Sequence, residues 1–189
     1  MTGCAFASFD TPVGRCAIVW RGDKVVGAVL SEVSDNALAA SVGRRFPGSI
    51  ETAPPPPMAD VIAAVLRLMK GEPEHFEDVE LDISALPDFE RLVLEATRGI
   101  PPGETRTYGE LAAAIGSPGA ARAVGRALGR NPIPIIIPCH RILAAGGRSG
   151  GFSAPGGSAT KLRLLSLEGA SRTGDPGLFE HLPLAMRPA

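Results

Sequence analysis

The sequence predicts an α/β protein of the α+β type, with a small α/β part at residues 1–84 and a mostly helical part at residues 85–170. Three observations support this division. Apolar, β-rich runs lie near the N-terminus, and apolar residues recur at helical spacing after residue 85. The charge also changes sign, because residues 1–84 carry a net charge of −5 and residues 85–169 carry +4. The length of 189 residues allows one or two domains.

The composition is that of an ordinary globular protein, with 44% apolar residues. No apolar stretch approaches the roughly 20 residues of a membrane-spanning helix, and the first ten residues do not resemble a secretory signal. Three cysteines make a disulfide framework improbable. We therefore expect a reducing cytoplasm. The protein is also expected to be a monomer.

The N-terminal part is expected to begin with a β-hairpin. Residues 13–20 and 24–30 are apolar and rich in β-formers, and a short loop, Arg21-Gly-Asp23, separates them. Residues 36–46 have helical spacing and stop before Pro47-Gly48. Three further segments complete this part: a stiff proline-rich connector at residues 52–57, a helix at residues 58–70 and a strand at residues 79–83.

The C-terminal part is expected to contain a helix-turn-helix. Thr107 and Glu110 form a capping box that starts one short helix, and residues 119–128 form the next. A tight turn containing Gly116 joins them, which is the helix-turn-helix pattern. The remaining predictions are a helix from residue 89 to about 99, a turn at 101–103, a helix at 158–167 and a loosely ordered tail at 171–189.

Cys139 is the first candidate for chemistry. It ends the proline-braced run NPIPIIIPCHR at residues 131–141, beside His140. A free cysteine is most often a small buried hydrophobe, but a nucleophilic thiol needs a nearby base and a fixed position, and this run can supply both. Glu168 could orient the histidine as the third member of a triad, or it is an ordinary solvated glutamate at a helix end.

The helix at residues 119–128 is the second candidate. Ala120 and Ala121 are small, and Arg122 and Arg126 are one turn apart. Such a helix packs closely on another protein helix or on DNA. A small-residue face with an inserted wedge suits the minor groove, and the positive charge of residues 85–169 favours a polyanionic partner. Tyr108, the one tyrosine, begins a helix and is either a core residue or a contact to phosphate and a proton donor.

Four motifs together closely resemble the O6-alkylguanine-DNA alkyltransferases, also called methylated-DNA–protein-cysteine methyltransferases. They are TYGELA at 107–112, AARAVG at 120–125, Asn131-Pro132 and IPCHR at 137–141. The resemblance runs from about residue 89 to residue 169. It implies a ribonuclease-H-like N-terminal domain at residues 1–84 and a winged-helix-like, DNA-binding and alkyl-accepting domain at residues 85–170.

The resemblance also implies an activity, the irreversible transfer of an alkyl group from O6-alkylguanine in double-stranded DNA to Cys139. O4-alkylthymine is a second candidate substrate. The base is flipped through the minor groove, and each protein acts once without a cofactor.

The same resemblance assigns roles to individual residues. Cys139 is the nucleophile, His140 takes its proton through a water, and Glu168 polarises the histidine. Asn131 braces the turn that holds the cysteine. The other implied roles are a proton donor to guanine at Tyr108, an intercalated finger at Arg122, DNA contacts at Ala120, Ala121 and Arg126, and a base pocket at Phe152, Ser153 and Ile142.

Two departures from the family pattern stand out. The segment GFSAPGG at residues 151–157 has Phe152 where many members have tyrosine, and it carries an extra Ala154-Pro155, so the lid over the base is expected to be longer. Some members bind zinc through N-terminal Cys and His residues. Here Cys4 and Cys16 are too few and the nearest histidine is His75, so no metal is expected.

Two other functions compete with alkyl transfer. A lesion sensor would flip the base without repairing it, but related sensors replace the nucleophile, which this chain retains as Cys139. A cysteine hydrolase using Cys139, His140 and Glu168 would leave the helix-turn-helix without a role.

Overall fold

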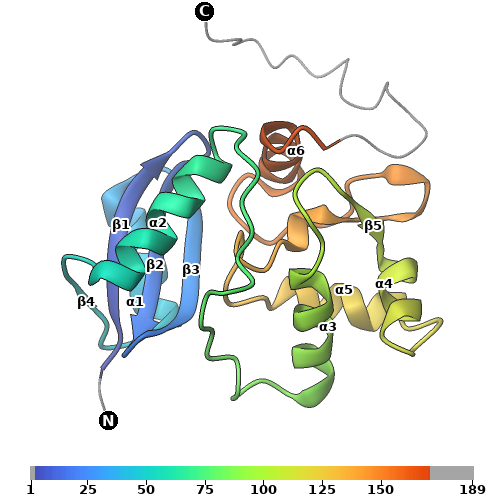
Figure 1. Ribbon diagram of the computed structural model, residues 1–189, viewed down its shortest axis with the longest axis horizontal. Coiled ribbons are helices and arrows are strands. Elements are labelled where there is room, and N and C mark those ends of the chain that lie inside the picture. Colours follow the sequence, from blue (N-terminus) through green and yellow to red (C-terminus); the bar gives the residue numbers. More distant parts are fainter. Residues whose placement is uncertain (1–2, 171–189) are drawn as a thin grey trace, which may run out of the picture.

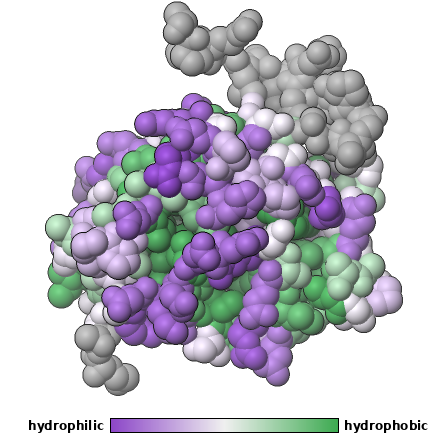
Figure 2. All heavy atoms as spheres, in the orientation of Figure 1, coloured by the Kyte–Doolittle hydropathy of each residue, from purple (hydrophilic) through white to green (hydrophobic). Residues whose placement is uncertain are grey.

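The computed structural model describes residues 3–170, and the predicted tail at 171–189 lies outside these residues. A sheet with two helices forms the N-terminal half, and most of the C-terminal half is helical (Figure 1). The predicted order, an α/β part followed by a mostly helical part, is confirmed. Among the described residues, no helix has the length and apolar character needed to cross a membrane. Polar side chains cover much of the face in Figure 2, with apolar residues between them.

The N-terminal sheet has four strands in the order β3-β2-β1-β4. The predicted hairpin is present and consists of β2 (Gly14–Arg21) and β3 (Lys24–Glu32), with Gly22 at φ 58° in its turn. The first residue of this two-residue turn needs a positive φ, which glycine adopts freely. The sequence did not reveal the remaining strands, β1 (Ala5–Thr11), antiparallel to β2, and the short β4 (Ile50–Glu51), parallel to β1.

Each face of the sheet packs against different helices, because side chains alternate along a strand. On one face, Ala17 and Val19 pack with Leu38 and Val42 of α1 (Asp35–Arg45). The opposite face, which includes Ile18, packs on α2 (Pro56–Leu68) and on the C-terminal half.

Two predictions for the N-terminal half need correction. The proline-rich connector at residues 52–57 was expected to exclude helix, but Pro56 and Pro57 form the first turn of α2. A first turn tolerates proline because its N–H groups have no partner within the helix. Residues 79–83 were expected to form a strand, but only Leu81 forms a bridge, to Val25 at the edge of β3.

The C-terminal half contains the predicted helices, with small shifts in their bounds. They are α3 (Asp88–Arg98), α4 (Tyr108–Ala114), α5 (Ala121–Gly129) and α6 (Gly157–Leu167), together with a two-stranded sheet of β5 (Arg106–Thr107) and β6 (Ile142–Leu143) and the short 3-10 helices η1 (Cys139–Arg141) and η2 (Ala145–Gly147). The predicted capping box between Thr107 and Glu110 begins α4. Helix α5 begins at residue 121 rather than 119, because Gly119 has φ 88° and belongs to the turn.

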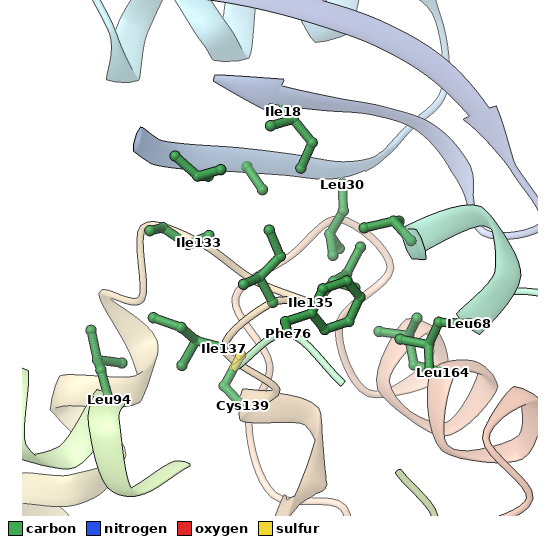
Figure 3. Packing of buried hydrophobic residues seen from close by; sticks show 14 of the residues in the cluster. Ile18, Leu30, Leu68, Phe76, Leu94, Ile133, Ile135, Ile137, Cys139 and Leu164 are labelled. Carbon is green, nitrogen blue, oxygen red and sulfur yellow. The ribbon is translucent and has the colours of Figure 1, made fainter. Parts of the chain in front are cut away.

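A run of isoleucines joins the two halves of the molecule. Figure 3 shows Ile133, Ile135 and Ile137 between the sheet residues Ile18 and Leu30 on one side and Leu94 of α3 on the other. All of these side chains are at most 2% exposed. The backbone N–H of Ala28 in β3 also donates to the carbonyl of Pro132 at 2.9 Å. The segment that leads to Cys139 is therefore packed against the N-terminal sheet.

Candidate active site

Cys139 lies at the end of a tightly braced loop. The amide of Asn131 donates from Nδ2 to the carbonyl of Ile137 at 2.8 Å, and its Oδ1 accepts from the N–H of Ile133 at 3.0 Å. A backbone bond from the N–H of Ile137 to the carbonyl of Ile133, at 2.9 Å, closes the same turn. These bonds fix the position at which η1 begins with Cys139. The bracing role expected for Asn131 has the geometry it requires.

The backbone of this loop is strained at one residue. Ile135 has φ 76°, the one positive φ of a non-glycine residue between positions 3 and 170. A branched Cβ makes this left-handed region unfavourable, by about 1–2 kcal/mol. Such a conformation persists only where its surroundings impose it, and here the side chain is buried, with 2% exposed.

His140, Glu168 and Arg141 form a buried network beside Cys139. The Nε2 atom of His140 lies 2.9 Å from Oε1 of Glu168. The guanidinium of Arg141 donates to both oxygens of Glu168, at 2.9 and 2.7 Å, and also to the carbonyl of Ile100. The side chains of His140 and Glu168 are only 1% and 2% exposed. The interpretation of Glu168 as a solvated helix-end residue is therefore wrong.

The environment sets the charge of each member of this network. Burial pushes the pKa of Glu168 upward, but His140 and Arg141 outweigh burial and lower it to about 2, so the carboxylate is ionised. Burial lowers the pKa of His140 despite the nearby carboxylate, so the imidazole is neutral at pH 7. Burial raises the pKa of Cys139, and the side-chain amide of Asn131 and the ammonium of Lys161 oppose this only in part. In the resting site Cys139 is thus a neutral thiol and His140 a neutral imidazole.

Tyr108 is held between a helix and a loop. A Cβ on Gly125 of α5 would lie 3.7 Å from its ring, and one on Gly150 would lie 3.1 Å from it. These two glycines give the ring its space. Burial raises the pKa of Tyr108, and proximity to Cys139 adds to this, so the phenol keeps its proton. In the cavity that it shares with Cys139, the phenol is therefore a hydrogen-bond donor rather than an anion.

Lys161 is a buried cation that the sequence did not single out. Its side chain is fully buried on α6, and its Nζ donates to the carbonyl of Ile142. Nζ also lies 5.7 Å from the centre of the Tyr108 ring. Burial lowers its pKa to about 8, and the attraction of Cys139 opposes this. A lysine on an amphipathic helix usually reaches water, so the sequence gives no sign of its burial.

A cavity of about 740 Å³ opens at Cys139 and connects the site to the helix-turn-helix. Its walls come from α4, α5 and the loop before α6, and include Tyr108, Ala121, Arg122, Cys139, Phe152 and Ser153. Glycine, alanine and aromatic groups make up most of the lining, which suits a flat, largely apolar ligand. Residues that are up to 46 positions apart in the sequence, from Thr107 to Ser153, therefore meet at one opening.

The residues expected to contact DNA divide into two groups. Arg122 is exposed on α5, and both it and Ala121 line the cavity. Arg126 is exposed one turn further along the helix and is outside the cavity wall. Ala120, which precedes the first residue of α5, is half-buried and packs against the core. Only Arg122 among these side chains combines charge with access to the cavity.

Two of the three residues expected to form a base pocket line the cavity. Phe152 is half-buried and Ser153 is exposed, and both line the cavity. Ile142 does not line the cavity, since its side chain is fully buried in β6. It contributes to the site through its carbonyl, which accepts from Lys161. Both residues of β6 are buried, Ile142 in the main core cluster and Leu143 in a smaller cluster with Leu165.

The sequence analysis missed two residues of the site. One is Lys161, and the other is Arg141, which follows His140 and donates to both oxygens of Glu168. The position of Arg141 directly after the Cys-His pair was a signal that it could belong to the site.

For residues 3–170, no group of three or more His, Cys, Asp or Glu side chains could hold a metal ion.

The fold and the site define an α/β protein that carries a cysteine in the wall of a cavity beside a helix-turn-helix, followed by a buried histidine–glutamate pair. Residues 88–170 match the family model described as "6-O-methylguanine DNA methyltransferase, DNA binding domain". A methylated-DNA–protein-cysteine methyltransferase of Methanothermobacter thermautotrophicus is 32% identical over 163 residues, which cover 86% of this chain and 84% of that relative. The chain belongs to the O6-methylguanine DNA methyltransferase family.

Other known proteins agree with this assignment. The corresponding Mycobacterium tuberculosis protein is 51% identical over 110 residues, 58% of this chain, and this match spans 64% of that relative, slightly less than two thirds of its length. The crystal structure of Mycobacterium tuberculosis OGT in complex with DNA superposes with a TM-score of 0.73 at 36% identity, covering 87% of this chain and 92% of that one. The O6-methylguanine-DNA methyltransferase of Pyrococcus kodakaraensis gives a TM-score of 0.68 at 27% identity, covering 87% and 99%.

Proposed function

We propose that this protein repairs O6-alkylguanine in double-stranded DNA by moving the alkyl group irreversibly to its own Cys139. One observation carries the proposal. The thiol, a phenol and an exposed arginine of the helix-turn-helix share a single cavity of about 740 Å³. A flipped purine needs a pocket of this kind, together with a group that holds the vacated place in the stack. The division into domains at residues 1–84 and 85–170 is part of the same proposal.

The thiol is activated by His140. Because burial keeps the pKa of Cys139 high, attack requires a base, and burial also keeps His140 neutral and able to accept a proton. Its Nε2 is paired with Glu168, and its Nδ1 is buried with no hydrogen-bond partner within residues 3–170. We assign Nδ1 to take the thiol proton through a bound water. Glu168 then stabilises the imidazolium that forms.

The guanine leaves with help from Tyr108. The sulfur forms a bond to the first carbon of the alkyl group, and the bond between that carbon and O6 breaks as its electron pair goes to guanine. Tyr108 gives its proton to the departing base, and general acid catalysis of this kind is worth about 10²–10⁴-fold. The proton gained by His140 balances the one lost by Tyr108. The product is a thioether, which no group in the site can cleave, so each protein acts once.

DNA is approached from the minor groove. Arg122 occupies the space that the flipped base leaves, and the small residues Ala120 and Ala121 allow α5 to come close to the groove. Arg126 adds a contact to the phosphate backbone. The net charge of residues 85–169 is only +4, so we expect moderate affinity, little sequence preference and a modest dependence on salt. One protein copy is enough for this reaction, and O4-alkylthymine is a second candidate substrate.

Label transfer tests the proposal. The protein is incubated with duplex DNA containing O6-methylguanine with a labelled methyl group, and its peptides are examined by mass spectrometry. We expect one methyl group on the peptide that contains Cys139, restored guanine in the DNA, and no transfer to the Cys139→Ala variant. Tight binding to the lesion with an unmodified Cys139 would contradict repair and point to a lesion sensor instead. Turnover of ester or amide substrates would favour a hydrolase.

A further inference from the structure

A second cavity reaches Cys139 from the side of the N-terminal sheet. Its volume is about 380 Å³. Residues of β3, of α1 and of the loop before α6 line it, so it lies between the two halves of the protein. The first and second cavities share Gly129, Cys139, Phe152 and Ser153 in their walls, so Cys139 borders both of them.

The two cavities would hold different parts of the same substrate. This step rests on the proposed function. Tyr108 and Arg122, the groups assigned to the base and to the DNA, line only the first cavity. In a displacement at carbon, the sulfur and the leaving oxygen lie on opposite sides of the carbon, and any longer substituent must extend sideways from it. At the position of Cys139, the second cavity offers that space.

The lining of the second cavity carries a clear excess of positive charge. Arg44, Arg45 and Arg130 face it, whereas Glu32 is its one acidic residue. Arg130 is paired with Glu90, which lies outside the cavity. Val29 and Leu30 are the two branched aliphatic side chains in the wall of this cavity. The second cavity is therefore mixed in polarity and its charged groups are mostly cationic, in contrast to the largely apolar first cavity.

The two arginines of α1 make hydrogen bonds only to neutral groups in the described part of the chain. Arg44 donates to the hydroxyl of Ser41 at 2.9 Å, and that hydroxyl donates to the carboxylate of Glu32 at 2.5 Å, so Arg44 reaches a carboxylate only through Ser41. Arg45 donates to the carbonyls of Ala28 and Pro132, at 2.8 and 2.9 Å. No ion pair with a carboxylate is found for either arginine within residues 3–170, and burial lowers the pKa of Arg45. An anion in this cavity would supply the missing counter-charge.

We propose that the second cavity is a subsite for the far end of long O6 substituents, and that it selects substituents ending in a carboxylate over those ending in an ammonium group. The substrate class is O6-alkylguanine in which the transferred carbon carries a chain or ring with a terminal anion. The chemistry of transfer is unchanged, because the same carbon–oxygen bond breaks and the same thioether forms. Methyl groups are too small to reach this subsite, so their transfer does not depend on it.

Three duplexes test the proposal, carrying O6-methylguanine, O6-(4-carboxybenzyl)guanine or O6-(4-aminomethylbenzyl)guanine. Single-turnover rates of Cys139 alkylation are followed by intact mass. We expect the carboxylate substrate to react about tenfold faster than the ammonium substrate, as charge recognition at a partly buried site predicts. Equal rates, a preference for the ammonium substrate, or failure of both benzyl substrates while methyl is transferred would overturn the proposal. Failure of methyl transfer itself would instead overturn the proposed function.

Charge reversal at Arg44 identifies the cause of the preference. Arg44→Glu should abolish or invert the preference and leave the O6-methylguanine rate within about twofold, because Arg44 lines only the second cavity. Lys70→Glu, an equal charge change at an exposed residue after α2, is the matched control and should keep the wild-type preference. If Arg44→Glu does not fold, Arg44→Gln should bring the two benzyl rates close together. An unchanged preference in a folded Arg44 variant would contradict the assignment.

Discussion

Glu168 sets the ionisation of the buried site. Its carboxylate is shared between His140 and Arg141, and both of its oxygens accept hydrogen bonds. Removing the negative charge would leave the guanidinium of Arg141 buried without a counter-ion, since only 4% of that side chain is exposed. Breaking a buried pair in this way typically costs about 3–5 kcal/mol. The residue therefore matters for stability as well as for the histidine.

Glu168→Gln should lower the free energy of unfolding by about 3 kcal/mol at pH 7. The pKa of Glu168 is depressed from 4.5 to about 2 in the fold, so its contribution is complete above pH 4.5 and is lost as the pH falls toward 2. Urea titrations of the wild type and variant at pH 7 and pH 3 measure the difference, which should shrink at pH 3. Glu104→Gln, at a more exposed ion pair with Arg106, should change little at either pH. A difference that is the same at both pH values would contradict this role.

Lys161→Met should slow methyl transfer about tenfold or more, because the variant loses the cation that stabilises a developing thiolate at Cys139. The fold should tolerate the change, since a thioether of similar volume replaces a buried charge. Because the pKa of Lys161 is about 8, the wild-type rate should fall as the pH rises through 8, whereas the variant rate should not. Single-turnover rates from pH 6.5 to 9 test this. Parallel pH profiles would show that Lys161 has only a structural role.

At the scale of elements, α5 presents two arginines with different surroundings. Arg122 lines the first cavity, whereas Arg126 lies outside its wall on the same helix. The two residues have the same charge and are both exposed. Substituting each arginine in turn therefore separates an effect on base flipping from an effect on the general attraction to DNA.

Arg122→Ala should slow repair of O6-methylguanine in duplex DNA by at least about tenfold, because nothing then fills the gap in the base stack. Arg126→Ala should weaken DNA binding slightly and reduce its salt dependence, with a repair rate close to wild type at saturating DNA. Single-turnover repair and salt-dependent binding isotherms distinguish the two effects. Equal losses of repair in both variants would contradict the assignment of the finger.

Local sequence signals predicted most of the elements. The capping box at Thr107 and Glu110 and the apolar spacing in α2 and α3 depend on neighbours along the chain, and these elements were found. Residues 79–83 have strand composition, yet only Leu81 meets a strand, because pairing depends on the three-dimensional path of the chain.

The same reasoning explains which parts of the site the sequence could reveal. Cys139, His140 and Asn131 lie in one contiguous motif. Lys161 and the second cavity arise from contacts between α6, β6 and the N-terminal sheet, which no local pattern encodes. The inward orientation of Ile142 likewise follows from the pairing of β6 with β5. Tertiary packing, rather than motif content, decides these features.

The molecule as a whole has one continuous core across its two halves. The buried cluster runs from the sheet through the isoleucines before Cys139 to the C-terminal helices (Figure 3). Arg45 adds a bridge between β3 and Pro132. Separation of the halves would expose this apolar surface to water, which is unfavourable by about 25 cal/mol per Å². We therefore expect the halves to unfold together.

Urea unfolding should give one transition for both halves. The single tryptophan, Trp20, is buried in β2 and reports on the N-terminal sheet by fluorescence. Pulsed hydrogen exchange of the α3 peptide, read by mass spectrometry, reports on the C-terminal half, since Val93, Leu94 and Thr97 of this helix are buried. The two midpoints should coincide. Loss of protection in α3 at a much lower urea concentration than the change in Trp20 fluorescence would show that the halves are independent.

The unusual backbone of Ile135 has a consequence for how the sulfur is located. Since this conformation opposes the residue's own preference, it reports on the forces that maintain it, namely the burial of the side chain and the two contacts of Asn131. Any change that relaxes the interior at this point would release the turn, and the thiol would move with it. The position of the Cys139 sulfur is thus set by the interior of the protein and not by the exposed surface that carries α5.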